Sequence, residues 1–284
     1  MATELLHAGF DAGSAGHLAS FKQLIESGPA VLVRVHATEG SVPREAGTWM
    51  AVFAASLVGT IGGGHLELQA IAHARAMLDA PDAAGVQAET GMRVALGPSL
   101  GQCCGGVVHL VFDRVNSDNM AQHAARLQPA LTPVALFGGG HVGHALVKAL
   151  ASLPFAVTWT DSRDGVFPEV VPATVRCEHS DPVQAAVRDL SPGSRVLIMS
   201  FSHAEDLDIV AACLQRQRLQ ADLPFIGLIG SHTKWATFRR RLEARGFTAD
   251  ELAQVTSPIG IPGISGKEPE VIAVAVAAQL LLTL

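Results

Sequence analysis

Two adjacent cysteines, Cys103 and Cys104, are the residues of this sequence best suited to chemistry at sulfur. They lie with Gln102 in the glycine-framed segment GQCCGG, which lacks the C-x-x-C spacing of a zinc ribbon or a thioredoxin site. A thiolate framed by glycines can exchange sulfur or bind a soft transition metal, so both cysteines are candidate metal contacts. The alternative, a buried thiol acting as a small apolar side chain, suits Cys177 and Cys213 better.

Two further loops in the same half of the chain have the composition of anion sites. GTIGGGHLE places three glycines before a helical pattern, where main-chain N–H groups can surround an anion. GSVPREAGTWM contains Arg44, whose guanidinium suits a phosphate or the edge of a pterin-like ring. Alternatively, His65 and Glu67 simply form the first helical turn, with Glu67 complementing the helix dipole. The candidate residues of these loops are Arg44, Gly62, Gly63, Gly64 and His65.

A G-x-G-x-x-G motif, formed by Gly138, Gly140 and Gly143, follows an apolar strand pattern and precedes a helical one. In that context the glycines let the main chain approach a pyrophosphate at the helix N-terminus. Asp161 ends the next strand, 18 residues after Gly143, close to the spacing at which a carboxylate contacts a ribose hydroxyl. The alternative is that the glycines only close the packing of helix on strand, with Asp161 a solvated turn residue.

A second candidate anion site follows a later strand, in the segment IGLIGSHTKWATFRRRL. Ser231 and Lys234 are its candidate binding residues, and Arg239 adds charge near the same edge. Arg240 and Arg241 are better explained as a solvated helix face.

Hydride transfer requires a proton donor or acceptor beside the reacting carbon. The chain has no tyrosine, and His141 and His144 flank the glycine loop, where they would lie near a phosphate. His203, which follows a strand, is a better candidate, although most such histidines cap or pack a helix. The glycine motif alone therefore does not establish a dehydrogenase.

The patterns around these residues predict two domains. The first is a small α+β domain over residues 1–115, with a helix at 18–27, strands at 30–37, 48–53, 92–96 and 107–111, and a helix at 65–78. A polar, proline-containing linker covers residues 116–131. Residues 132–284 alternate strands and helices, which predicts a Rossmann-like, doubly wound parallel sheet. Its strands are expected at 134–137, 156–159, 173–177, 195–199 and 224–229, with helices at 141–152, 182–190, 205–217 and 233–245.

The composition of the chain excludes some classes of partner and indicates where the protein acts. The chain has 284 residues and a formal net charge of -6, which argues against nucleic acid or an acidic membrane surface as a partner. The apolar stretch 271–284 is too short to span a bilayer and predicts a buried helix. The N-terminus lacks the basic cluster and apolar run of a signal peptide, and four cysteines give no secreted disulfide framework, so we expect a cytoplasmic protein.

Seven segments, in this order, resemble the XdhC/CoxI family of molybdoenzyme maturation factors: GSVPREAGTWM, GTIGGGHLE, GQCCGG, FGGGHVG, TDSRDGVFPE, GSHTKWATFRRRL and SPIGIPGISGKEPEVIAVAVAAQL. The resemblance extends from about residue 30 to the end. It implies a protein that binds molybdenum cofactor (molybdopterin) and delivers it to xanthine dehydrogenase or a related molybdenum hydroxylase. It also implies sulfuration of the metal together with a cysteine desulfurase. Cys103 and Cys104 would then contact sulfur or molybdenum, and Arg44 and the 62–64 glycines would face the cofactor.

The resemblance favours a cofactor-binding chaperone, expected as a homodimer, over an enzyme with turnover. The sequence is also compatible with two other functions. The glycine motif with Asp161 would also suit an NAD(P)-dependent oxidoreductase with a dinucleotide at the Rossmann site. A nucleotide sensor that regulates a partner would bind nucleotide without molybdenum.

Overall fold

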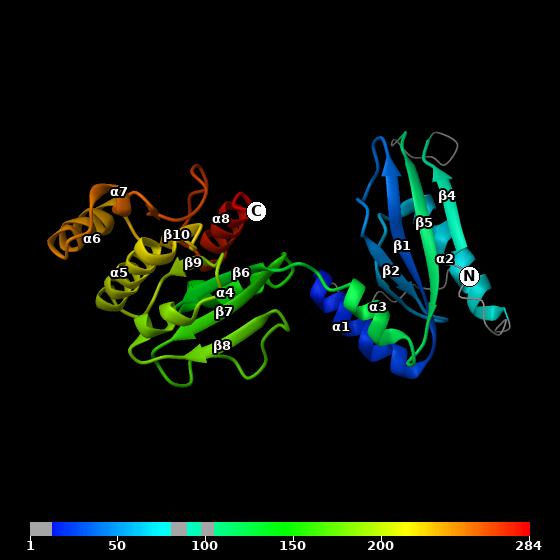
Figure 1. The fold of residues 1–284 in the computed structure, drawn as a ribbon, viewed down its shortest axis with the longest axis horizontal. Helices are drawn as coiled ribbons and strands as arrows, with labels where there is room; N and C mark the ends of the chain where they lie inside the picture. Colours follow the sequence, from blue (N-terminus) through cyan, green and yellow to red (C-terminus); the bar gives the residue numbers. More distant parts are fainter. Residues whose placement is uncertain (1–12, 81–89, 98–104) are drawn as a thin grey trace. The chain divides into compact units, whose positions relative to one another are not determined.

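We describe the protein from a computed structural model, which covers residues 13–80, 90–97 and 105–284 (Figure 1). The chain divides into two compact units, Met1–Gln128 and Pro129–Leu284. The division falls inside the segment that the sequence predicts as a linker, and each unit has its own hydrophobic core.

The N-terminal unit is an antiparallel sheet with the strand order β3-β2-β1-β5-β4. Its strands are β1 (Ala30–Glu39), β2 (Trp49–Val52), β3 (Leu57–Gly59), β4 (Thr90–Ala95) and β5 (Val107–Val115). Its helices are α1 (Ser14–Leu24), the short 3-10 helix η1 (Ile25–Ser27), α2 (Gly64–Asp79) and α3 (Met120–Arg126).

Strand alternation in β1 gives this sheet a core on each face. Val31 and Val33 point toward α2, where they pack with Leu66. Ala30 and Leu32 point to the other face, in the cluster formed by α1, η1 and α3. The sheet is therefore covered by helices on both sides, and its connecting loops lie at its two ends.

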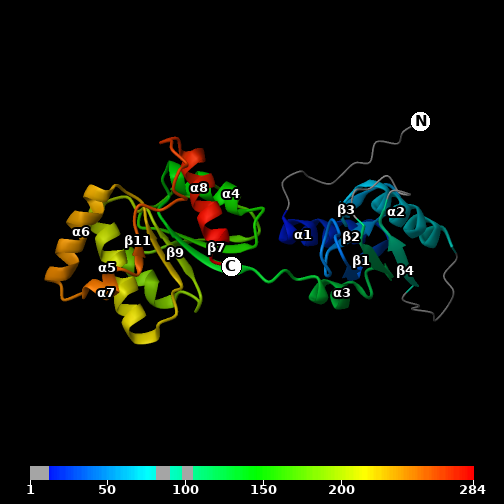
Figure 2. The same cartoon turned by 90° about the horizontal axis from the view of Figure 1, so that it is seen from above.

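The C-terminal unit is a parallel sheet with the strand order β11-β10-β9-β6-β7-β8. Figure 2 shows β11, β9 and β7 in this order. This order equals 6-5-4-1-2-3 in strand sequence, the doubly wound Rossmann arrangement, and confirms the predicted fold class. The strands are β6 (Thr132–Phe137), β7 (Phe155–Asp161), β8 (Val175–His179), β9 (Arg195–Ile198), β10 (Phe225–Leu228) and β11 (Val255–Thr256). The helices are α4 (His141–Leu150), η3 (Val183–Asp189), α5 (His203–Gln220), α6 (His232–Ala244), α7 (Ala249–Leu252) and α8 (Pro269–Leu281).

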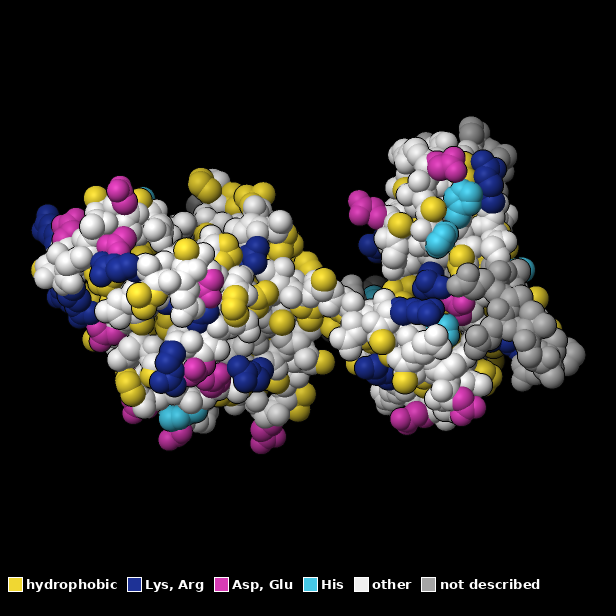
Figure 3. All heavy atoms as spheres, viewed as in Figure 1, with side chains coloured by type: hydrophobic (Ala, Val, Ile, Leu, Met, Phe, Trp, Pro, Cys, Tyr) yellow, Lys and Arg dark blue, Asp and Glu magenta, His cyan; other side chains and the backbone are white. Residues whose placement is uncertain are grey.

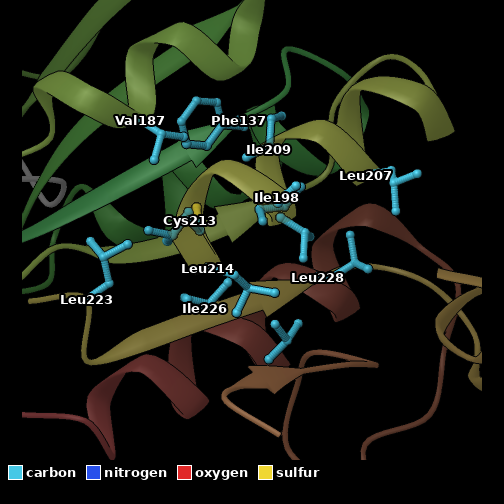
Figure 4. Packing of buried hydrophobic residues seen from close by; sticks show 14 of the residues in the cluster. Phe137, Val187, Ile198, Leu207, Ile209, Cys213, Leu214, Leu223, Ile226 and Leu228 are labelled. Atoms are coloured by element: carbon cyan, nitrogen blue, oxygen red, sulfur yellow. The ribbon is translucent and has the colours of Figure 1, made fainter. Parts of the chain in front are cut away.

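Helices cover both faces of this parallel sheet. On one face α4 and α8 pack on Leu136, Trp159 and neighbouring side chains. On the other face η3, α5, α6 and α7 pack on Phe137, Ile198 and Ile226 (Figure 4). Because every strand is parallel, the strand ends that carry the candidate residues meet at one edge, the usual ligand edge of such folds.

The apolar C-terminal segment forms α8, whose Ala273, Val276 and Leu280 are buried, as the sequence predicts. Cys213 is also buried, and burial raises the pKa of its thiol to about 12, which confirms its role as a small apolar side chain. In the described part of the chain, no helix is both long enough and apolar enough to cross a bilayer.

Candidate functional site

Antiparallel pairing brings three connections to one end of the N-terminal sheet. Glu39 at the end of β1 pairs with Val107 at the start of β5, and Val107 also pairs with Ala95 at the end of β4. Gly59, which ends β3, pairs with Met50 near the start of β2. We call this region the loop end. It comprises residues 40–48, residues 60–63, and the return of the β4–β5 connection at Gly105 and Gly106.

Gly106 joins the β4–β5 connection to the loop that contains Arg44. Its N–H donates to the carbonyl oxygen of Ser41 at 3.1 Å, and its own carbonyl accepts from the N–H of Leu96 at 2.8 Å. A Cβ at position 106 would lie 2.5 Å from the carbonyl oxygens of both Glu39 and Ser41, a distance that real Cβ atoms do not reach. Only glycine fits there, so the residues that follow the cysteine pair lie directly against this loop.

Gly62 makes the second close contact at the loop end. It has a φ of +123°, and a Cβ there would approach the ring of Pro43 to 2.9 Å and Cγ of Arg44 to 3.3 Å. The loop before α2 therefore packs on the Pro43–Arg44 turn. Two of the segments singled out by the sequence are thus neighbours in the fold.

Glu67 holds the glycine loop in shape from the first turn of α2. Its carboxylate accepts hydrogen bonds from Thr60 Oγ1 at 2.5 Å, from the N–H of Ile61 at 3.0 Å and from the N–H of Gly63 at 3.2 Å. The N–H of Gly62 donates to Thr60 Oγ1 at 3.1 Å. The amides available to an external anion are therefore those at the start of α2, from Gly64 onward, which lack intrahelical acceptors.

Two cationic or titratable side chains extend from the loop end into solvent. Arg44 and His65 are exposed, and neither has a side-chain partner among the described residues. Arg44 also acts on His17 of α1: burial first, and then the Arg44 charge, lower the pKa of His17. Nearby, Nε2 of His109 in β5 lies 3.1 Å from a carboxylate oxygen of Glu39 in β1. Figure 3 shows histidine and charged side chains over the N-terminal sheet.

Gln102, Cys103 and Cys104 lie outside the described residues, so their predicted roles stay predictions. Within the ranges that the structure covers, no group of three or more His, Cys, Asp and Glu side chains is arranged to hold a metal ion.

In the C-terminal unit, two glycines of the G-x-G-x-x-G motif lie so close to neighbouring main chain that no side chain would fit. A Cβ on Gly138 would lie 2.0 Å from the carbonyl oxygen of Met199, and one on Gly143 would lie 2.1 Å from that of Gly138. Trp159 donates its indole N–H to the Gly138 carbonyl at 2.9 Å. Gly140, by contrast, is exposed with nothing near its Cβ direction, so the packing role applies to Gly138 and Gly143.

Asp161 lies against the glycine loop, but its carboxylate is already engaged. It accepts from the N–H of Gly139 at 2.5 Å and from the main chain, Nε and Nη2 of Arg163, each at 2.9 Å. Only 2% of Asp161 is exposed, so the alternative of a solvated turn residue is wrong. Burial acts to raise the pKa of this carboxyl, but the hydrogen bonds from Arg163 and Gly139 outweigh it and lower the pKa.

Lys234 and Ser231 also make contacts within the fold. Ser231 caps α6, its side chain accepting from the N–H of Lys234 at 3.2 Å. The Lys234 ammonium donates to Asp206 at 2.6 Å and to the Ile229 carbonyl at 2.9 Å. Asp206 in turn accepts from Ser200. Two of the three ammonium hydrogens thus have internal acceptors, which leaves at most one for a ligand.

The helices at this edge differ in whether a side chain accepts hydrogen bonds from the free N–H groups of their first turn. Ser202 caps α5, which also has Glu205 and Asp206 in its first turn. Within the described chain, α4 has neither a side-chain cap nor an acidic residue in its first turn. The start of α4, at His141, is therefore the most open of these helix ends to an external anion. His203 and Arg239–Arg241 are exposed, as expected for Arg240 and Arg241 on a solvated helix face.

Three residues that organise these sites were not singled out from the sequence: Arg163, Asp206 and Glu67 as a loop ligand. The D-x-R spacing of Asp161 and Arg163 was a usable signal for their ion pair. Nothing in the sequence indicated that Asp206 would meet Lys234, 28 residues away.

Comparison with known proteins agrees with both units. Residues 24–87 match the family described as the XdhC and CoxI family, and residues 134–280 match the XdhC Rossmann domain. The protein YqeB of Escherichia coli strain K12 is 28% identical over 260 residues, which are 89% of this chain and 43% of YqeB. This chain therefore spans less than half the length of that relative.

A solved structure has the same fold over nearly the whole chain. It is a protein from Bacillus halodurans, described as a xanthine dehydrogenase, with a TM-score of 0.72 and 19% sequence identity. The match covers 94% of this chain and 95% of that one. At this identity the likeness concerns the fold alone.

We predict that Gly106→Ala lowers the stability of the N-terminal unit by about 1–3 kcal/mol, the usual range for overpacking. The new methyl group would overlap the carbonyl oxygens of Glu39, at the end of β1, and of Ser41, in the β1–β2 loop. Chemical denaturation of the full chain measures the change. Gly105→Ala is the control, because nothing lies within 4 Å of its Cβ direction. Equal effects of the two substitutions would contradict the described contact.

We predict that Arg44→Gln raises the pKa of His17, because it removes a nearby positive charge. The pKa should stay below 6.5, since burial is the larger cause of its lowering. NMR titration of the imidazole measures this. Since the folded state disfavours protonated His17, its contribution destabilises the protein as the pH falls below 6.5. Arg126→Gln is the reciprocal control: it should raise the pKa of His123 and leave His17 unchanged.

We predict that Asp161→Asn destabilises the C-terminal unit by about 1.5–3 kcal/mol, the cost of losing hydrogen bonds to a charged group. The wild-type stabilisation should be present above the usual carboxyl pKa of 3.8 and be lost as the pH falls through the lowered value. Denaturation curves between pH 7 and pH 3 test both statements. Asp164→Asn, at a side chain 98% exposed, should change stability by less than about 0.5 kcal/mol. Similar losses in both variants would argue against the Asp161 network.

Proposed function

The chain belongs to the XdhC and CoxI family, and from that premise we propose that it is an accessory protein in the maturation of a molybdenum hydroxylase. In this proposal it binds molybdenum cofactor, supports its sulfuration and delivers it to the apoenzyme, xanthine dehydrogenase or a relative. It acts by holding and transferring the cofactor, without turnover of a substrate.

The observation that carries the proposal is the convergence at the loop end. Gly106, which closely follows the cysteine pair, contacts the loop of Arg44, and Gly62 contacts the same loop from the other side. The Arg44 loop, the glycine loop before α2 and the residues that follow the cysteine pair therefore share one end of a small sheet, although they are far apart in the sequence.

The described residues at the loop end fit the anionic part of the cofactor. Arg44 offers an exposed guanidinium that can pair bidentately with a phosphate. The first amides of α2 and the exposed His65 add hydrogen-bond donors beside it. In the proposal, Cys103 or Cys104 supplies the soft thiolate for molybdenum or for sulfur transfer.

The partners follow from this role. The apoenzyme receives the cofactor, and a cysteine desulfurase supplies sulfur for the metal. We place the process in the cytoplasm and expect a homodimer. The same role requires no nucleic acid and no membrane.

A second candidate is an NAD(P)-dependent oxidoreductase, favoured by the Rossmann strand order and by the open N-terminus of α4. Against it, the Asp161 carboxylate that would accept a ribose hydroxyl is occupied by Arg163 and Gly139. A dinucleotide would have to displace that ion pair. We therefore rank the accessory role first.

The test is the cofactor content of the full-length protein purified from cells that make molybdenum cofactor. Elemental analysis for molybdenum and fluorescence analysis of the oxidised pterin should find both in the wild-type protein. Arg44→Gln should lower retention about tenfold or more, the effect of losing a hydrogen bond to a charged group. Replacing both Cys103 and Cys104 by Ser should lower the molybdenum content more than the pterin content.

Arg126→Gln provides the matched control, because this exposed arginine of α3 follows β5 and lies at the opposite end of the sheet. It should retain the cofactor at the wild-type level. Wild-type protein free of molybdenum and pterin would overturn the proposal, as would equal losses in the Arg44 and Arg126 variants. Saturable NADH binding with hydride turnover would favour the second candidate instead.

A further inference from the structure

The segment between β11 and α8 encloses a pocket in the C-terminal unit. Figure 1 shows this segment, in orange to red, beside β10 and α8. The pocket lies just beyond the end of β10, at Ile229 and Gly230, and its volume is about 260 Å³. The 259–267 loop and the first turns of α8 complete its lining. It belongs to the ligand edge of the sheet but involves none of the glycine-motif residues.

Apart from that of Lys267, the side chains that line this pocket are apolar, and polar main-chain atoms are exposed between them. Ile229, Ile259 and Ile272 form part of them and also pack against the core beneath α4 and α8. Ile264 lies at the mouth and is 45% exposed. We call the site the isoleucine pocket. Apolar walls of this kind take the faces of a flat ring rather than a chain of charged groups.

The volume sets the size of the ring system. An apolar cavity of about 150 Å³ holds one benzene ring. The isoleucine pocket, at about 260 Å³, has room for two fused rings but is smaller than the pockets of about 300–1,000 Å³ that hold drug-sized ligands. A whole dinucleotide does not fit in it.

Polar groups of both signs lie at the rim. Lys267 is the one charged residue among the described lining residues, and it is exposed. Glu268 follows it and folds back, so that a Cβ on Gly266 would lie 2.8 Å from its Oε2. That oxygen accepts the main-chain N–H of Lys267 at 3.0 Å, which leaves further acceptor positions on the carboxylate.

Lys267 and Glu268 are consecutive residues at the rim, and their side chains supply one donor and one acceptor. Such a pair suits the edge of a ring that offers an acceptor and a donor in turn. The Lys267 ammonium can donate to a ring carbonyl, and the Glu268 carboxylate can accept from an amino group or ring N–H.

We propose that the isoleucine pocket binds a two-ring nitrogen heterocycle with an amino–oxo edge, the edge shared by pterins and guanine. Ile264 packs on the face of the ring, and Lys267 and Glu268 form hydrogen bonds with its amino–oxo edge. This deepens the proposed function, because a pterin is part of the proposed cargo, and only the choice of pterin over guanine rests on that function.

The experiment is fluorescence titration of the full-length protein with pterin, alongside calorimetric titration with guanosine and with quinoxaline, a two-ring heterocycle without the amino–oxo edge. Ile264→Glu should weaken binding of all three probes tenfold or more, by placing a charge against the ring. Lys267→Gln and Glu268→Gln should each weaken pterin about tenfold and leave quinoxaline unchanged. Circular dichroism confirms that each variant is folded.

Leu219→Glu is the matched control for Ile264→Glu. Leu219 is 81% exposed, near the end of α5 and away from the ligand edge, so this change should leave all affinities unaltered. Tighter binding of pterin than of guanosine identifies the cofactor as the source of the ring, and the reverse identifies a guanine nucleotide. No binding of either probe, or equal affinities for Ile264→Glu and Leu219→Glu, would overturn the proposal. The two proposals fail separately, because Arg44→Gln tests retention of the whole cofactor at the loop end, whereas Ile264→Glu tests binding of the free ring systems in this pocket.

Discussion

The N-terminal site depends on one steric constraint, the approach of the Gly106 main chain to the carbonyl oxygens of Glu39 and Ser41. Antiparallel pairing already brings the ends of β1, β3 and β4 together, but pairing alone would leave the loops free to separate. The Gly106 contact fastens the return of one loop to the next. Glu67 then fixes the glycine loop with three hydrogen bonds, so Arg44 extends from a rigid base. The cofactor site that we propose at the loop end would require such support.

In the C-terminal unit, internal partners occupy several groups that a nucleotide would need. Asp161 pairs with Arg163, and Lys234 pairs with Asp206, so both charges stabilise the edge of the sheet. What stays open is the start of α4 and the isoleucine pocket. A Rossmann fold by itself does not determine its ligand, and here the occupied carboxylate argues for a ligand other than a dinucleotide.

Local patterns predicted much of this fold. Hydrophobic periodicity located most strands and helices, since burial on one face repeats over each element. The short elements α3, α7 and β11 carried too few periods to be recognised. Glycine spacing identified the loop at Gly138. It did not indicate that Asp161 and Met199 would contact this loop, because these residues follow or end other strands. The link between Gly106 and Ser41 joins positions 65 residues apart, and the isoleucine pocket is built from two separate segments, residues 229–230 and 259–275. Neither leaves a signal within a single window of sequence.

The central claim is that the Arg44 loop and the cysteine pair serve one bound cofactor. A double-mutant cycle on the affinity for molybdenum cofactor tests it most directly, with Arg44→Gln on one axis and the joint replacement of Cys103 and Cys104 by Ser on the other. If both act on the same bound molecule, their effects should deviate from additivity by more than about 0.5 kcal/mol. Additive losses within that limit, or no loss on either axis, would contradict the account.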